Sequence, residues 1–249
     1  METVKTEGVI LRAYPLAEKD RIISVYTRLL GKISGVVPRA AQPTSHYWGK
    51  LESFGLVELV FLLHAQRALV KVQSVELICA FGARLPSYGN FLQLSLIAEI
   101  LIETSPEREP NDDLYRLLML VLPRFKDRDS GPLAALYFKI WYLKIAGLLP
   151  ATRACQKCAK ILAGAEDVFI VGGLTGLVCG VCRVSLDQRV SQSAYRLLGA
   201  IRRHSLNDLQ SESLDSGSIT ELSWIAEAML ERNFERHFRS LQLLRSEGA

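Results

Sequence analysis

The residues of this chain best suited to chemistry are four cysteines in two CxxC pairs. Cys155 and Cys158 form the first pair, Cys179 and Cys182 form the second, and twenty residues lie between the pairs. Two-residue spacing lets both thiolates of a pair turn toward one point, where backbone N–H groups of the turn support the sulfurs. Two such pairs give a site of four sulfurs at the corners of a tetrahedron, the preferred geometry of structural zinc. The spacing therefore predicts one structural Zn2+ ion bound by all four cysteines.

The residues between the two pairs fit a zinc ribbon. Phe169-Ile170-Val171 predicts a short strand, Gly172-Gly173 a turn, and Leu177-Val178 a return strand. With four protein sulfurs bound, no coordination position is left for water or substrate, so we expect the metal to support structure and to do no chemistry. The alternative is two disulfides or four free thiols. Disulfides belong to oxidising compartments, and nothing in the sequence indicates one.

Length and composition set broad limits. The 249 residues suffice for one large domain or for two to three small ones, and 49% of them are hydrophobic, enough for real cores. Residues 1–5 lack a basic segment followed by an apolar one, and no apolar run reaches the roughly 18–20 residues that cross a bilayer. We therefore expect a cytoplasmic protein without membrane contact. The net charge of +4 permits nucleic-acid binding but does not require it.

The first eighty residues read as short strands. The expected strands are Gly8–Tyr14, closed by Pro15, then Asp20–Tyr26, Ile33–Val37, Gly55–Leu63 and Ala68–Ile78. Five short strands with no helix of ordinary length predict a small closed barrel, and the OB-fold is the common five-stranded form.

Beyond residue 80 the apolar period becomes helical. The expected helices are Asn90–Glu103, Asp113–Leu122, Leu133–Gly147, Ser191–Arg203 and Ile219–Leu244, with an exposed loop at Asn207–Gly217. The predicted fold class is α+β. It comprises an N-terminal five-stranded OB-fold β-barrel at 1–80 and an α-helical domain at 81–249, into which the zinc ribbon is inserted at about 151–185.

Basic and aromatic side chains in the barrel segment predict a nucleic-acid surface. An OB barrel binds single strands through a charged groove and through exposed aromatic rings that stack on bases. The candidate DNA contacts are Arg12, Arg21, Arg28, Lys32, Arg39, Tyr47, Trp48 and Lys50. The competing interpretation is that these are ordinary solvated charges and half-buried rings, with Tyr47-Trp48 packing the barrel mouth.

Motifs for catalysis are absent from the sequence. It has no Walker lysine motif, no GxSxG and no HExxH, and its four histidines do not cluster with a plausible nucleophile. We therefore expect a protein that is not an enzyme.

Five short motifs occur in order around the cysteine quartet. They are Gly8-Val9-Ile10-Leu11-Arg12 followed by Glu18-Lys19-Asp20-Arg21-Ile22; Thr27-Arg28-Leu29-Leu30-Gly31-Lys32; Leu51-Glu52-Ser53-Phe54; residues 143–150 leading into Cys155; and Arg236-His237-Phe238 through Ser240-Leu241 and Leu244. Together, over essentially the whole chain, they resemble the RecO family of bacterial recombination mediators.

This resemblance implies a nucleoid-associated DNA repair protein that binds single- and double-stranded DNA and anneals complementary strands. It also implies action with RecR and help in loading RecA onto DNA coated by single-strand-binding protein. The acidic C-terminal tail of that protein would need an apolar pocket beside cations. The helical part offers Arg124, Lys126, Arg128, Lys139 and Lys144 for this purpose.

The sequence departs from the family pattern at residues 37–45. Relatives typically carry a run of basic residues there, whereas this chain keeps only Arg39. The departure supports a rival interpretation, a zinc-ribbon scaffold that binds protein and has lost its DNA groove. A third class, a metal-dependent nuclease, needs a carboxylate cluster that the sequence does not offer.

Overall fold

The computed structural model of the chain describes residues 2–42, 44–47, 49–127, 129–162, 167–172, 174–210 and 214–247. The chain forms two compact units. The first contains residues 1–131 and 238–249, and the second contains residues 132–237. The domain boundary expected at residue 80 stays a prediction. In the described part of the chain, no helix is both long enough and apolar enough to cross a membrane.

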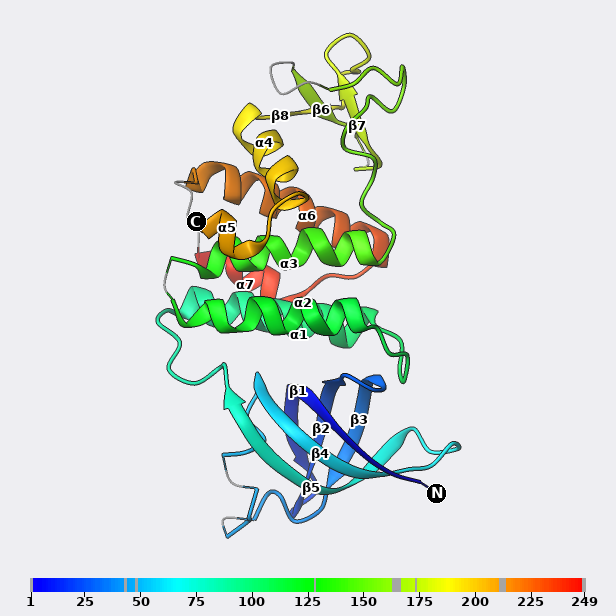
Figure 1. Cartoon of the computed structure of the whole chain (residues 1–249), viewed down its shortest axis with the longest axis vertical. Coiled ribbons are helices and arrows are strands. Elements are labelled where there is room, and N and C mark those ends of the chain that lie inside the picture. Colours follow the sequence, from blue (N-terminus) through cyan, green and yellow to red (C-terminus); the bar gives the residue numbers. More distant parts are fainter. Residues whose placement is uncertain are drawn as a thin grey trace. The chain divides into compact units, whose positions relative to one another are not determined.

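The first unit begins with a closed five-stranded barrel, drawn in blue to cyan in Figure 1. Its strands are β1 (Glu2–Leu16), β2 (Asp20–Thr27), β3 (Gly31–Val37), β4 (Gly55–Leu63) and β5 (Leu69–Ala80). They pair in the order β1-β2-β3-β5-β4, and β4 pairs back with β1. The pairs are antiparallel except for β3 with β5, which is parallel. This arrangement confirms the predicted OB-fold.

Alternation of side chains builds the barrel core. Ile23 and Val25 of β2 and Ile33 of β3 point inward with branched residues of the other strands, and all are nearly inaccessible to solvent. Strand β1 starts six residues earlier than expected and runs through Pro15. Proline has no backbone N–H to donate. It is tolerated here because this half of β1 pairs only with β2, so no strand on the other side needs that hydrogen bond.

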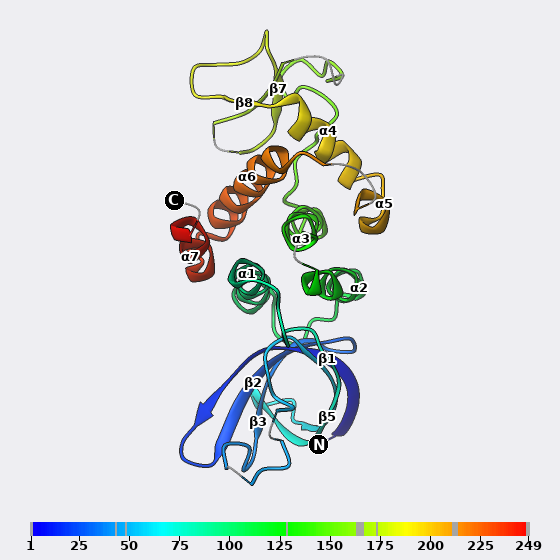
Figure 2. The ribbon, with the colours of Figure 1, turned by 90° about the vertical axis from the view of Figure 1, so that its left-hand side faces the viewer.

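Two helices and a return segment complete the first unit. They are α1 (Tyr88–Thr104), α2 (Asp112–Val121), which continues as the short 3₁₀ helix η1 (Leu122–Lys126), and the C-terminal α7 (Arg239–Glu247). Helix α7 packs along α1, as Figure 2 shows. The buried carboxylate of Glu99 fixes this packing, since it accepts the N–H groups of Arg239 and Ser240 at 2.7 and 2.9 Å.

Polar side chains cap the two helices that follow the barrel. Asn111 caps α2 by accepting the N–H of Leu114. Ser87 caps α1 by accepting the N–H of Asn90. Asn90 is buried inside the first turn and donates to the carbonyl of Phe125 at 3.0 Å, so it holds η1 against α1.

The second unit contains α3 (Gly131–Ile145, nearly all of it in this unit), α4 (Gln192–Ile201), α5 (Leu206–Gln210) and α6 (Ser216–Phe234), with the small cysteine-containing sheet. Helix α3 is apolar almost all round and is followed by Gly147, whose φ of +71° is the left-handed conformation expected of a helix-terminating glycine. The prediction of a loop at Asn207–Gly217 was partly wrong, because its first residues belong to α5, where Leu209 is buried.

The prediction of one long C-terminal helix at Ile219–Leu244 was also wrong. Helix α6 ends at Phe234, and its C-cap residue Glu235 adopts the left-handed conformation at φ +52°. The chain then changes direction, Phe238 is buried at 1% exposure, and α7 starts at Arg239. The helical spacing of apolar residues continues from α6 into α7, so it does not reveal where the helix is interrupted. The buried contact of Phe238 and the distant carboxylate of Glu99 determine the position of the interruption.

Candidate metal centre and nucleic-acid interface

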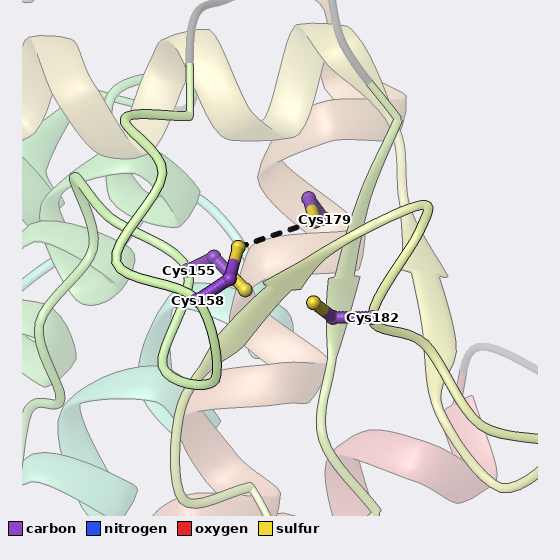
Figure 3. Close-up of side chains that lie close together, drawn as sticks. All are labelled: Cys155, Cys158, Cys179 and Cys182. Carbon is purple, nitrogen blue, oxygen red and sulfur yellow. Dashed lines mark hydrogen bonds between the residues drawn. The ribbon is translucent and has the colours of Figure 1, made fainter.

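The four cysteines of the two CxxC pairs come together in the second unit. Their Sγ atoms all lie within 4.8 Å of one another, and Figure 3 shows the sulfurs of both pairs turned toward a common point. No disulfide joins any two of them, and the Sγ atoms of Cys158 and Cys179 are 3.9 Å apart. A tetrahedral ion about 2.3 Å from each sulfur would hold the sulfurs about 3.8 Å apart. The cluster can therefore hold a metal ion.

Each pair sits on a tight turn whose backbone supports its first sulfur. Burial opposes ionisation of Cys155, but the N–H groups of Cys179, Cys158 and Lys157 outweigh it and lower the pKa of this thiol to about 6. The N–H groups of Cys182 and then of Val181 lower the pKa of Cys179 in the same way, against burial. These contacts place stabilised thiolates in both turns.

The close approach of the sulfurs disfavours a thiolate at Cys182. Hydrogen bonds with the sulfurs of Cys158 and Cys179 raise the pKa of Cys182 to about 12. A bound divalent cation removes this conflict, because a coordinating thiol is deprotonated outright. The donor set of four sulfurs suits a soft or borderline metal such as zinc.

A three-stranded sheet carries the two turns. Strands β6 (Val168–Ile170) and β7 (Leu177–Cys179) are the predicted pair, and Gln156 of the first turn donates to the carbonyl of Leu177 at 2.8 Å. Gly173, in the predicted turn, lies outside the described residues. A third strand, β8 (Gln188–Val190), pairs with β6 and was missed, because three residues between polar loops give no strand pattern.

The candidate DNA residues of the β3–β4 loop are only partly available. Arg39 is exposed, and its N–H donates to Asp20 at 2.8 Å. Tyr47 packs against the barrel core and donates its hydroxyl to the carbonyl of Gln73 at 3.0 Å. The ammonium of Lys50 lies 2.9 Å from the Glu76 carboxylate. The latter two contacts agree with the competing interpretation of packed rings and paired charges.

Glu76 also lies within 3.4 Å of His46. Its hydrogen bonds with Lys50 and then with His46 lower its pKa, so the carboxylate stays ionised and offsets the basic charge of the loop. Trp48, the other predicted stacking residue of this loop, lies outside the described residues.

The remaining candidates occupy different surroundings. Lys32 is buried, with its ammonium 2.6 Å from the carbonyl of Ile102 at the end of α1 and 3.6 Å from Glu107. Arg28 is exposed at the β2–β3 turn, 3.8 Å from Asp112. Arg21 is half-buried at one end of β2, and Arg12 is exposed on β1.

The strand register brings together an outer face that the sequence did not define. Paired residues point to the same side of the sheet, so the register gives two rows on the outside of the closed barrel, which run around it from β1 through β2 and β3 to β5. One row is Tyr14, Ile22, Val36 and Lys71, and the other is Arg12, Ser24, Ser34 and Leu69. We call these eight residues the outer face.

The outer face carries exposed apolar and basic side chains. Tyr14 is 44% exposed and Leu69 is 40% exposed. Arg12 on β1 and Lys71 on β5 are exposed to solvent at the two edges of the outer face. A shallow groove runs from Val36 to the β4–β5 turn, where Arg67 is exposed. Strands 2 and 3 with this turn form the usual binding face of OB-folds. Tyr14 and Lys71 are among the aromatic and basic residues of the barrel segment, but the sequence did not single them out, because their place in one row depends on pairing between distant strands.

Family models and curated relatives match nearly the whole chain. The model described as "Recombination protein O N terminal" matches residues 1–81, and the one described as "Recombination protein O C terminal" matches residues 87–242. The chain is 33% identical to the DNA repair protein RecO of Frankia casuarinae over 98% of its own length and 99% of that relative. It is 28% identical to the DNA repair protein RecO of Anaeromyxobacter dehalogenans over 98% and 96% of the two chains. It is 25% identical to the one of Koribacter versatilis over 96% and 97%.

Proposed function

We propose, from the premise that this chain belongs to the RecO family of DNA repair and recombination proteins, that it binds single- and double-stranded DNA and promotes annealing of complementary strands. We further propose that it acts with RecR to load RecA onto DNA coated by single-strand-binding protein, whose C-terminal tail it contacts. The observation that carries the DNA-binding part is the outer face, where exposed Tyr14 and Arg12 on β1 and exposed Lys71 on β5 flank the outside of β2 and β3.

The proposed mechanism needs no covalent chemistry. Basic side chains replace counterions along the phosphates, which gives affinity without sequence preference. Tyr14 offers a ring on which any base can stack. A strand held along the outer face has its charge partly neutralised by Arg12 and Lys71, so a complementary strand approaches with less repulsion. We accordingly propose that the protein is not an enzyme.

In this proposal the metal is zinc and its role is structural, because four sulfur ligands leave no open coordination position. The ribbon sheet has strands of three residues and little core of its own, so a metal replaces the missing core. Lys139 is an unsuitable contact for the tail of single-strand-binding protein, because it is 1% exposed and paired with Glu227.

The outer face can be tested against the loop that contains Arg39. Replacing two phosphate contacts by Arg12→Ala with Lys71→Ala should lower the salt slope on single-stranded DNA by about 1.4, at roughly 0.7 for each contact. Tyr14→Ala should weaken binding by about 1–3 kcal/mol if a base stacks there. Binding is measured by fluorescence anisotropy with a labelled oligo-dT across a salt series.

Lys5→Ala is the matched control, since this barrel lysine is already paired with Glu58 at 2.9 Å. If the Arg12→Ala with Lys71→Ala variant bound DNA like wild type while Arg39→Ala weakened binding strongly, the DNA site would instead be the β3–β4 loop. If the wild-type chain bound no DNA even at low salt, the rival interpretation of a protein-binding scaffold would stand in its place.

A further inference from the structure

The second unit holds a basic cavity that the proposed barrel site does not use. It has a volume of about 510 Å³ and lies where the end of α3, the first cysteine turn and α4 meet. Its cations are Lys144, Arg153, Arg196, Arg202 and Arg203, and its apolar wall includes Ile161, which is 67% exposed. A site with five cations and an apolar wall suits a large anion that also carries an apolar part.

The two chain segments that form this cavity carry no acidic residue. Residues 144–162 contain four lysines and arginines and no aspartate or glutamate, and residues 188–207 likewise contain four and none. Outside the cavity lining, Arg189 is paired with Asp167 at 2.6 Å, whereas Lys157 donates to the carbonyl of Cys182, so the basic surface continues beyond the cavity at Lys157. Acidic residues elsewhere in the unit do not offset it locally, since the five cavity cations have no carboxylate within ion-pair distance in the described part of the chain.

Hydrogen bonds hold the cavity in shape. The hydroxyl of Tyr195 on α4 lies 2.9 Å from the carbonyl of Thr152 and 2.8 Å from that of Leu162, which ties the first cysteine turn to the helix. The guanidinium of Arg202 donates to the Thr152 hydroxyl. Its Nε is buried without a hydrogen-bond partner among the described residues, so a donor remains to be satisfied at the wall of the cavity.

Arg203, just past the end of α4, lies beside Gly199 of that helix, and both residues line the cavity. The guanidinium of Arg203 is 3.5 Å from the position that a Cβ of Gly199 would take, which is an ordinary van der Waals contact. Arg203 therefore lies along the helix at the wall of the cavity.

We propose that this cavity and the basic surface around it form a second nucleic-acid site, which takes the phosphodiester backbone of a DNA strand. The proposal rests on the proposed DNA-binding function and deepens it. Four arginines favour phosphate, whose oxygens match the planar guanidinium fork. A basic surface that extends past the cavity fits a polyanion better than a short acidic peptide, whose charge would end inside it. Ile161 and Leu162 offer apolar contact to a sugar or a base.

Two sites on separate units have a direct consequence for annealing. One strand binds on the outer face of the barrel and the other at the cavity of the second unit, so a single chain holds both reactants. Pairing then becomes intramolecular, and the effective concentration of one strand near the other rises.

The full-length chain with Arg153→Gln, Arg196→Gln and Arg203→Gln tests the proposal. These three arginines are exposed, and the variant keeps Arg202 and Tyr195, which hold the fold. Wild type should bind two molecules of a short oligo-dT per chain, and the triple variant should bind one. The salt slope of total binding should fall by about two, at roughly 0.7 for each contact. Strand annealing should slow, while the melting temperature stays within a few degrees of wild type.

The control is Arg84→Gln, Arg232→Gln and Arg239→Gln, which removes the same charge from exposed positions outside the cavity. The control should keep two strands per chain. Arg12→Ala with Lys71→Ala should also leave one strand, now at the cavity, so loss at the barrel and loss at the cavity are distinguishable.

A triple variant that still bound two strands with an unchanged slope would overturn the inference and leave the barrel site standing. The inference would also be overturned if the variant kept its DNA binding and lost only binding to a synthetic Asp-rich peptide, which would assign the cavity to an acidic partner protein. Failure of wild type to bind any DNA would instead remove the proposed function itself.

Discussion

Cys179→Ser should abolish stoichiometric metal binding and strongly destabilise the cysteine-containing part of the second unit. Apparent binding free energies of structural zinc in small domains are about 10–16 kcal/mol, far more than three-residue strands supply. Elemental analysis of wild type should find one zinc per chain. Thermal unfolding, followed by the fluorescence of Trp141 and Trp224 in the second unit, should show an earlier transition in the variant and in wild type treated with a chelator.

Cys79→Ser is the matched control, because this half-buried cysteine lies near the end of β5 in the barrel and is remote in sequence from the cluster. It should keep the metal and the wild-type transition. A Cys179→Ser protein with one bound zinc and an unchanged transition would contradict the four-sulfur site. DNA binding at the barrel's outer face should survive in Cys179→Ser, since that face belongs to the other unit.

The metal centre was predictable because its chemistry is local. Two-residue spacing fixes how the sulfurs of one pair turn, and the only distant requirement is that two turns meet. The barrel was predictable for a similar reason: alternation identifies strands, and β4 begins and ends at the predicted residues. Strand β1 was underestimated because its first half, Glu2 to Glu7, shows mixed polarity and is held by pairing with β4.

The DNA residues were less predictable because a cation's role depends on distant neighbours. Lys32 looks like any barrel lysine, but its partner is the carbonyl of Ile102, seventy residues away. Lys139 was a candidate for the tail of single-strand-binding protein, but Glu227, 88 residues away, pairs with it in the interior. Tyr14 and Lys71 share a row only after four strands have paired. Composition identifies basic residues, whereas register and burial determine which of them meet solvent.

The buried pair of Lys139 on α3 and Glu227 on α6 gives the second large effect. The Lys139 ammonium is 1% exposed and 2.6 Å from the Glu227 carboxylate. Burial lowers the pKa of Lys139, and the carboxylate of Glu227 opposes this shift. Glu227→Ala leaves an ammonium without its partner in the apolar interior of the unit, which costs about 3–5 kcal/mol of unfolding free energy. Urea unfolding should show the loss, with Trp141 and Trp224 as probes in a Trp48→Phe background, which removes the one tryptophan of the barrel segment.

A double replacement separates the charge effect from packing. Lys139→Met with Glu227→Leu removes both charges and keeps similar volumes, and such replacements of buried pairs are often neutral or stabilising by about 1–4 kcal/mol. We therefore expect the double variant to recover most of the stability that Glu227→Ala loses. Glu231→Ala, one turn further along α6, is the control for removing a carboxylate from that helix. If Glu227→Ala unfolded within about 1 kcal/mol of wild type, the pair would be open to water and Lys139 would again be available to bind a partner. If the double variant were as unstable as Glu227→Ala, shape at this position, and not the unpaired charge, would account for the loss.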